Sequence, residues 1–398
     1  MLDHRKLGRE LEIYHLDPLV GAGLPIWLPA GAAMRHAIES YIREVERLAG
    51  YQHVYSPPLA KREMYQKSGH LAKFGDDMFP PLALGEEELM LRPSLCPHHA
   101  MVFQARGRSY RELPLRVAEL GGMYRAERSG VVGGLSRVRA IQLNDAHLFC
   151  MPEQVGQEVA VILSMILKAH KVLGFAADSF RLSCRGDLAQ GNYLGEPAQW
   201  DQAEGLLREA LAASGVSYVE APGEAAFYGP KIDIQIRDIH GREFSLSTIQ
   251  VDFAQPERFD LNYVASDGSR ARPVMVHRSL IGSLERLVGH LIEVHQGAFP
   301  AWYAPVQLAV LPVSAEQAEA AYRLADSALQ LGLRVEVYPD ESLGARIRKV
   351  SKVPYVAVIG AREADSGEVA LRERGGGQRS LSVAEALDQV GEHCRLPL

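Results

Sequence analysis

The chain has 398 residues, of which 47% are hydrophobic and 23% charged, a composition typical of a soluble globular protein with roughly two or three domains. Its net charge of −6 argues against a protein that coats nucleic acid by bulk electrostatics. Four widely spaced cysteines without a C-x-x-C pair argue against a disulfide framework and favour a reduced, cytoplasmic setting. Because no apolar stretch approaches about 18 residues and Met1–Lys6 is rich in charge, we expect neither a membrane span nor a signal region.

Two long helices are predicted in the first part of the chain. Apolar residues at helical spacing predict a helix over residues 31–49, which Gly50 ends. The same spacing recurs over residues 153–173, where Gly174 is placed to form the C-cap.

Strands follow these helices. Lys231–Ile236 alternates apolar and polar residues, as a half-buried strand does. His240-Gly241 then predicts a tight turn into a second strand over residues 243–253. Helices and strands therefore come in blocks, and we predict an α+β domain with an antiparallel sheet over residues 1–300.

Residues 301–398 have a different rhythm, in which short apolar strands alternate with helices. The expected order is strand, helix, strand, helix, strand, over residues 306–311, 315–331, 334–338, 343–350 and 353–359. This alternation predicts a second, small α/β domain around a parallel or mixed sheet. Gly375–Gly377 is interpreted as a hairpin loop, because no strand-to-helix junction follows it.

Three segments of the first part carry residues suited to chemistry, namely Arg92–His99, Tyr124–His147 and Val276–Arg286. At these residues the sequence resembles threonyl-tRNA synthetases, which are class II aminoacyl-tRNA synthetases, and the likeness covers nearly all of the chain. Further matches lie at Ser68–His70 and Ala226–Asp233. The resemblance implies the class II synthetase fold, an anticodon-binding-like second domain, and a form without the amino-terminal editing domains of full-length relatives.

The resemblance also implies a zinc site formed by Cys96, His147 and His277. One thiolate and two imidazoles suit Zn²⁺, and three protein ligands leave a position open. An amino acid with an amine and a β-hydroxyl could chelate there, whereas an aliphatic side chain lacks the second donor. Intervals of 51 and 130 residues are no local zinc signature, so the assignment depends on the resemblance. His98 and His99 stand beside Cys96, but adjacent residues rarely point at one metal.

The ATP site is likewise assigned by resemblance. The phosphates of ATP need cations where charge grows during attack on the α-phosphorus, and guanidinium groups suit this task. The family pattern gives Arg125 the α-phosphate and the substrate carboxylate, and gives Arg286 the adenine ring and the γ-phosphate. Mg²⁺ is expected to bridge the phosphates. The full set of expected ATP contacts is Arg125, Glu127, Arg137, Gln250 and Arg286.

Four further residues complete the matched pocket. The resemblance puts Asp145 against the substrate amine or hydroxyl and Tyr228 beside the amine. It puts Lys231 and His70 near the reacting carboxylate and the transfer step, so the expected catalytic residues are Arg125, Arg286, Lys231 and His70.

The sequence also departs from the family pattern around this pocket. Leu143 and Ser245 stand where glutamines are usual, Ser247 replaces a glycine, and Ser94-Leu95 replaces a Met-Asn pair. Loss of a polar partner costs about 1–3 kcal/mol of binding. We interpret these changes as a retuned pocket for threonine, for serine or for an unusual β-hydroxy amino acid.

Three functions stay open on the sequence alone. They are a threonine–tRNA ligase, a paralogue that passes its adenylate to a carrier protein or a small-molecule amine, and a non-catalytic binding protein. Residues 301–398 hold 11 Lys and Arg against 13 Asp and Glu, a net of −2, and phosphate tracking needs positive charge. The helix over residues 31–49 and the segment that ends at Pro57 resemble the dimer-forming motif of the family, so we expect a homodimer.

Overall fold

The computed structural model describes residues 2–186 and 193–398. Its contacts divide the chain into two compact units. The first comprises Met1–His15, Ile26–Glu44 and Leu291–Leu398, and the second comprises Leu16–Pro25 and Val45–His290. The predicted division of the sequence at residue 300 stays a prediction.

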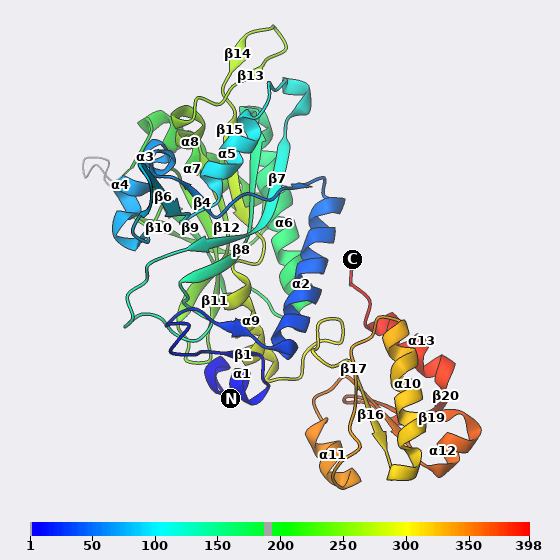
Figure 1. The fold of residues 1–398 in the computed structure, drawn as a ribbon. Coiled ribbons are helices and arrows are strands. Elements are labelled where there is room, and N and C mark those ends of the chain that lie inside the picture. Colours follow the sequence, from blue (N-terminus) through cyan, green and yellow to red (C-terminus); the bar gives the residue numbers. More distant parts are fainter. Residues whose placement is uncertain (1, 187–192) are drawn as a thin grey trace. The chain divides into compact units, whose positions relative to one another are not determined.

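An eight-stranded sheet forms the centre of the second unit (Figure 1). From β9 to β7 the strands pair with one another antiparallel, whereas the edge strand β10 is parallel to β9 and the edge strand β3 is parallel to β7. The predicted antiparallel α+β fold is therefore confirmed. In sheet order the strands are β10 (Tyr218–Pro222), β9 (Ser179–Cys184), β11 (Lys231–Arg237), β12 (Glu243–Asp252), β15 (Val274–Ser279), β8 (Ala140–Cys150), β7 (Leu115–Tyr124) and β3 (Gln52–His53).

The two predicted strands are β11 and β12, and a tight turn at Gly241 joins them. Ile232, Ile234 and Ile236 are fully buried on one face of β11. The alternate residues of β11 are polar and share the opposite face with the paired polar residues of β12, because opposed residues of antiparallel strands point the same way. This polar face is the one that carries the candidate site.

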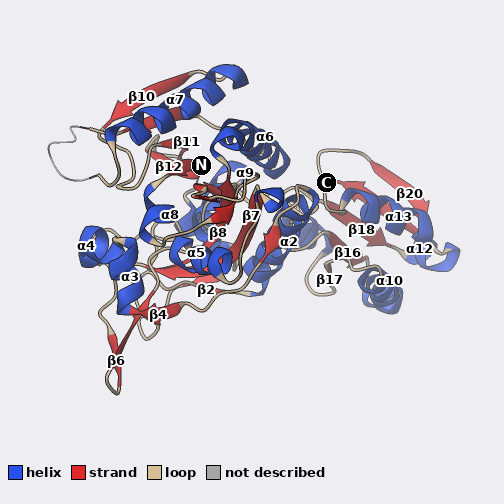
Figure 2. Ribbon diagram, turned by 90° about the horizontal axis from the view of Figure 1, so that it is seen from above, coloured by secondary structure: helices blue, strands red, loops and turns tan. Residues whose placement is uncertain are grey.

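Helices cover the sheet on both sides (Figure 2). The predicted helix over residues 153–173 is α6 (Val155–Leu173), whose C-cap Gly174 adopts φ 90°. It lies beside α7 (Pro197–Ser214), while α5 (Cys96–Gln104) contacts β8. The predicted helix over residues 31–49 is α2 (Pro29–Leu48). Smaller helices are α1 (His4–Glu10), α3 (Arg62–Ser68), α4 (His70–Phe74), α8 (Ala254–Arg258) and α9 (Leu284–His295).

Three small sheets accompany the central one. Each is an antiparallel pairing of short strands. They are β1 (Tyr14–His15) with β2 (Ile26–Trp27), β13 (Tyr263–Val264) with β14 (Arg270–Ala271), and β4 (Leu59–Lys61) with β6 (Glu87–Leu91) and β5 (Leu82–Leu84). Over the described residues, no helix combines the length and apolar character that a bilayer span requires.

The C-terminal part forms a five-stranded mixed sheet with its own core, as the sequence predicts. The first three strands are parallel and the last two antiparallel. In sheet order they are β17 (Val335–Val337), β16 (Leu308–Pro312), β18 (Tyr355–Ile359), β19 (Glu368–Glu373) and β20 (Gln378–Ser382). Gly375–Gly377 forms the loop of the β19–β20 hairpin. The helices are α10 (Ala318–Gln330), α11 (Leu343–Lys349), α12 (Ala361–Ser366) and α13 (Val383–His393).

Candidate active site and metal centre

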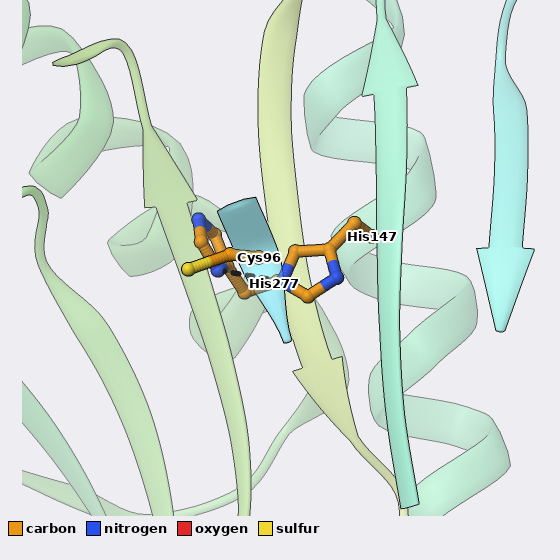
Figure 3. A group of neighbouring side chains, drawn as sticks. All are labelled: Cys96, His147 and His277. Carbon is orange, nitrogen blue, oxygen red and sulfur yellow. Dashed lines mark hydrogen bonds between the residues drawn. The ribbon is translucent and has the colours of Figure 1, made fainter. Parts of the chain in front are cut away.

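Cys96, His147 and His277 meet on the polar face of the sheet (Figure 3). His147 of β8 and His277 of β15 are directly opposed in the antiparallel register, so their side chains share one face. Cys96 is the first residue of α5. One potential ligand atom from each residue lies within 4.8 Å of the others, and all three residues are buried. Sheet register thus brings together residues that are far apart in the sequence.

The outer nitrogen of each imidazole is held by a second group. His277 Nε2 lies 2.8 Å from Asp252 Oδ2, and His147 Nδ1 lies 2.7 Å from His99 Nδ1. The inner nitrogens, His277 Nδ1 and His147 Nε2, face each other at 3.0 Å. A ligand histidine that is fixed through its second nitrogen is the usual arrangement in zinc sites.

Electrostatics at the three residues also fits a metal. Burial, followed by the neighbouring His277 and His99, holds the pKa of His147 well below its usual range, so this imidazole is neutral. Burial raises the pKa of the Cys96 thiol, but a bound cation reverses that preference because it stabilises the thiolate. Ser94 Oγ lies 3.2 Å from the sulfur. One thiolate and two imidazoles form a donor set that suits Zn²⁺.

A cavity of about 250 Å³ opens beside the metal group. Side chains from β8, β12 and β15 line it, together with the start of α9. Gly282 is required there, because it adopts φ +67° and an added Cβ would lie 2.3 Å from the Leu246 carbonyl oxygen. The predicted site residues in its lining are Arg125, Asp145, Tyr228, Gln250, His277 and Arg286.

Arginine side chains converge at this cavity. Burial lowers the pKa of Arg286, and the positive charges of Arg125 and Arg137 lower it further. Arg125 is affected in the same direction by burial and by Arg137, although Glu127 opposes the shift. Mutual repulsion of this kind is relieved by a bound anion, so the arrangement favours a polyanionic ligand.

Two further polar side chains, Asp145 and Tyr228, belong to the same lining. Burial raises the pKa of Asp145 to about 6, against the opposing effect of His99 and His277. The Tyr228 hydroxyl donates to Gln250 Oε1 at 2.5 Å, and its ring stacks on the His277 ring with centroids 4.8 Å apart. The stacking contact joins Tyr228, a predicted amine-binding residue, to a histidine of the metal group.

Comparisons with known proteins agree with this geometry. Residues 83–295 match the family model of the tRNA synthetase class II core domain (G, H, P, S and T), and residues 307–393 match an anticodon binding domain. The crystal structure of the RNA binding domain of threonyl-tRNA synthetase from Cryptosporidium parvum Iowa II superposes with a TM-score of 0.93 at 34% identity, over 98% of each chain. The chain belongs to the threonyl-tRNA synthetase family.

Curated members of the family are more similar still in sequence. The threonine–tRNA ligase of Halalkalibacterium halodurans is 48% identical over 98% of this chain, and that of Geobacillus kaustophilus is 47% identical over 99%. The chain spans 61% of the length of each of these two relatives.

The remaining residues expected from the family pattern do not line the cavity and contact other side chains instead. They are Glu127, Arg137, Lys231 and His70. Glu127 and Arg137 pair with each other at 2.8 Å, and the Arg137 side chain is 52% exposed. Lys231 Nζ lies 2.8 Å from Asp233 Oδ2. His70 Nε2 lies 3.7 Å from the Cys96 sulfur, and burial, aided by the charge of His277, lowers the pKa of His70 to about 3. His70 therefore adjoins the metal group.

The departures from the family pattern do not all line the cavity. Ser94, Leu143 and Ser245 line the cavity. Ser247 does not, because its hydroxyl lies 2.8 Å from His170 Nε2 of α6 and donates to the Leu280 carbonyl. The expectation that Ser247 contributes to a retuned pocket is therefore wrong.

Several residues of the site were missed by sequence reasoning. Thr248 and Arg278 line the cavity, while Asp252 and His99 hold the two histidines of the metal group. The one signal available was the position of His99, three residues after Cys96 at the start of a helix, where both side chains share a face.

Proposed function

We propose that the chain activates threonine, or a related β-hydroxy amino acid, with ATP and transfers the activated amino acid to tRNA. The observation that carries this proposal is a single cavity whose lining contains both His277, a member of the buried thiol–imidazole group, and the guanidinium groups of Arg125 and Arg286. The first suits a metal that selects an amino acid, and the second suits the phosphates of a nucleotide.

In this proposal the Cys96 thiolate, His147 Nε2 and His277 Nδ1 hold a zinc ion. The zinc, when bound, supplies a Lewis acid with an open position for the amine and β-hydroxyl of the substrate. Asp145, which is buried in the cavity wall, accepts hydrogen bonds from the same amine or hydroxyl. Valine has no hydroxyl, so it would leave polar groups of the site unpaired and bind less well.

Activation joins the amino acid to the nucleotide. A carboxylate oxygen attacks the α-phosphorus of ATP, a P–O bond forms, and the bond to the bridging oxygen breaks with release of pyrophosphate. Arg125 and Arg286 stabilise the charge that grows on the phosphate oxygens, and Mg²⁺ accompanies the phosphates as part of the substrate. Glu127, Gln250 and Arg137 are assigned to the adenine and the outer phosphates.

Transfer then moves the aminoacyl group to the terminal ribose of tRNA, with AMP as the leaving group. His70 and Lys231 are assigned to this step, and the match of residues 307–393 to an anticodon binding domain supports tRNA as the acceptor. The domain boundary near residue 300, the homodimer and the cytoplasmic location belong to the same proposal. Light scattering that returned a monomer mass at micromolar concentration would refute the dimer.

A second candidate keeps the activation step and changes the acceptor to a carrier protein or a small-molecule amine. It is favoured by Leu143 and Ile141, which present apolar groups in the cavity wall, and by the net charge of −2 over residues 301–398. A non-catalytic role has no such support, because the arginines and the metal-group residues are all present.

ATP–pyrophosphate exchange over a panel of amino acids tests activation, and charging trials with tRNA test the acceptor. We expect threonine to give the fastest exchange, with valine slow, followed by charging of threonine tRNA. Exchange without charging would favour the second candidate, and no exchange with any amino acid would contradict both.

A further inference from the structure

His99 occupies a buried position between a carboxylate and a metal-group histidine. Its Nε2 lies 3.2 Å from Glu119 Oε2, and its Nδ1 lies 2.7 Å from His147 Nδ1. The side chain of His99 is fully buried, and that of Glu119 is 3% exposed. The His99 ring meets the His147 ring edge-on, with centroids 4.7 Å apart. The three side chains thus form a chain that ends at the metal group.

Glu119 can only accept hydrogen bonds at this position, because it is ionised. Burial alone would raise its pKa, but hydrogen bonds with His99 and Ser56 and the charge of Arg92 outweigh burial and bring the pKa to about 2. Arg92 Nη2 lies 3.0 Å from Glu119 Oε1, and the Ser56 hydroxyl donates to Glu119 Oε2 at 2.6 Å. His99 Nε2 must therefore carry a proton, through which it donates a hydrogen bond to the carboxylate.

The position of the proton on His99 in turn determines where His147 carries its proton. With its proton on Nε2 and a lone pair on Nδ1, His99 accepts from His147 Nδ1. With its proton on Nδ1, His147 has a lone pair on Nε2, the nitrogen that lies 3.0 Å from His277 Nδ1. The opposite tautomer of His147 would place a proton where a metal must bind.

We propose that His99 is a positioning residue of the metal centre, which uses its bond to Glu119 to fix the tautomer and the ring orientation of His147. The inference rests on the proposed metal-dependent function and goes beyond it. His277 needs no such intermediary, because Asp252 bonds its outer nitrogen directly. One turn of α5 therefore supplies both a ligand, Cys96, and the residue that orients another ligand.

The first test measures metal binding instead of activity. Co²⁺ binding is followed by its thiolate charge-transfer and d–d absorption, and Zn²⁺ affinity by chelator competition. His99→Phe keeps a ring but removes the acceptor, and we expect it to weaken metal binding by about 10–100-fold, the usual effect of losing such a partner. His99→Asn restores an acceptor near the Nδ1 position and should recover most of the affinity. His98→Phe makes the same exchange at the adjacent buried position and should change affinity less than twofold.

The outcomes separate this inference from the proposed function. One outcome would be that His99→Phe keeps the metal affinity and absorption of the wild type while Cys96→Ala binds no metal. That outcome would overturn the role of His99 but would still support the metal centre. If the wild-type chain binds no metal, both the proposed metal-dependent function and the role of His99 are contradicted. Equal losses in His99→Phe and His99→Asn would indicate packing alone and would also overturn it.

A second measurement needs no substitution and so does not depend on whether a variant folds. Long-range ¹H–¹⁵N correlation spectra of the protein with labelled histidines report which ring nitrogen carries the proton. We expect protonation at Nδ1 for His147 and at Nε2 for His99, whereas a His147 protonated at Nε2 would contradict the proposal.

Discussion

The metal group with its hydrogen-bond partners, named the metal end of the site, and Arg125, Arg137 and Arg286, named the nucleotide end, differ in the interactions that hold their side chains. At the metal end, carboxylates and imidazoles bond to one another in a buried network, in which Asp252 holds His277 and Glu119 holds His99. At the nucleotide end, Arg125 and Arg286 repel each other, and Arg137 is half exposed. The metal end is preorganised, whereas the nucleotide end gains its stabilising partner only when a polyanion binds. Substitutions at the two ends should therefore fail in different ways.

The largest effect is expected at the metal end. Cys96→Ala should reduce bound zinc from one per chain to near zero, since two imidazoles alone hold the metal poorly. Loss of the Lewis acid removes several kcal/mol of stabilisation, so exchange activity should fall by about 10³-fold or more. The fold should survive, because only one buried thiol is lost. Cys150→Ala, at a buried cysteine outside the metal group, is the matched control and should retain zinc.

The next effect is expected at the nucleotide end. Arg125→Ala removes a charge directed at the reacting phosphate, and a loss of about 10²–10³ in exchange rate is expected for one electrostatic donor. Zinc content should not change, and this distinguishes the two ends. Activity within twofold of the wild type, in a variant with an unchanged unfolding temperature, would exclude the catalytic assignment.

Substitutions at Leu143 and Ser245, which line the cavity, test the specificity of the site. The double variant Leu143→Gln, Ser245→Gln adds two polar groups to the cavity lining. In a retuned enzyme, kcat/KM for threonine should improve by about 1–3 kcal/mol if both hydrogen bonds form. No gain, with robust charging by the wild type, would show that these two departures are silent and that the chain is an ordinary threonine–tRNA ligase.

The smallest effect is expected for Arg137→Ala. This side chain is largely in water and pairs with Glu127, and exposed ion pairs contribute little to stability. We expect the free energy of unfolding to change by less than about 0.5 kcal/mol and KM for ATP to rise by about tenfold or less. A large loss of stability would show that the nucleotide end is as preorganised as the metal end.

The sequence predicts much of the fold, because hydrophobic periodicity and glycine stops are local signals. It predicts the helix that ends at Gly174 and the strands joined at Gly241, and both are found. The metal group follows from resemblance alone. Its residues meet through the pairing of β8 with β15, which no spacing along the chain reveals.

Ser247 shows where residue-by-residue reasoning fails. Strict alternation would put Ser245 and Ser247 on one face of β12. The structure has a β-bulge, in which Gln235 pairs with Ser245 and Ile234 pairs with Ser247, so Leu246 is extra. Ser245 lines the cavity while Ser247 turns to α6. His99 was missed for a different reason, because it was judged only as a rival ligand and not as the partner of one.

The central claim is that a metal in this cavity selects the amino acid that ATP activates. Threonine-dependent ATP–pyrophosphate exchange, measured on one preparation before zinc removal, after chelation and after zinc is returned, tests it most directly, with valine as the matched amino acid. We predict that threonine exchange falls with the zinc content and recovers with it, while valine exchange stays low throughout. Undiminished threonine exchange in protein with near-zero zinc would contradict the account.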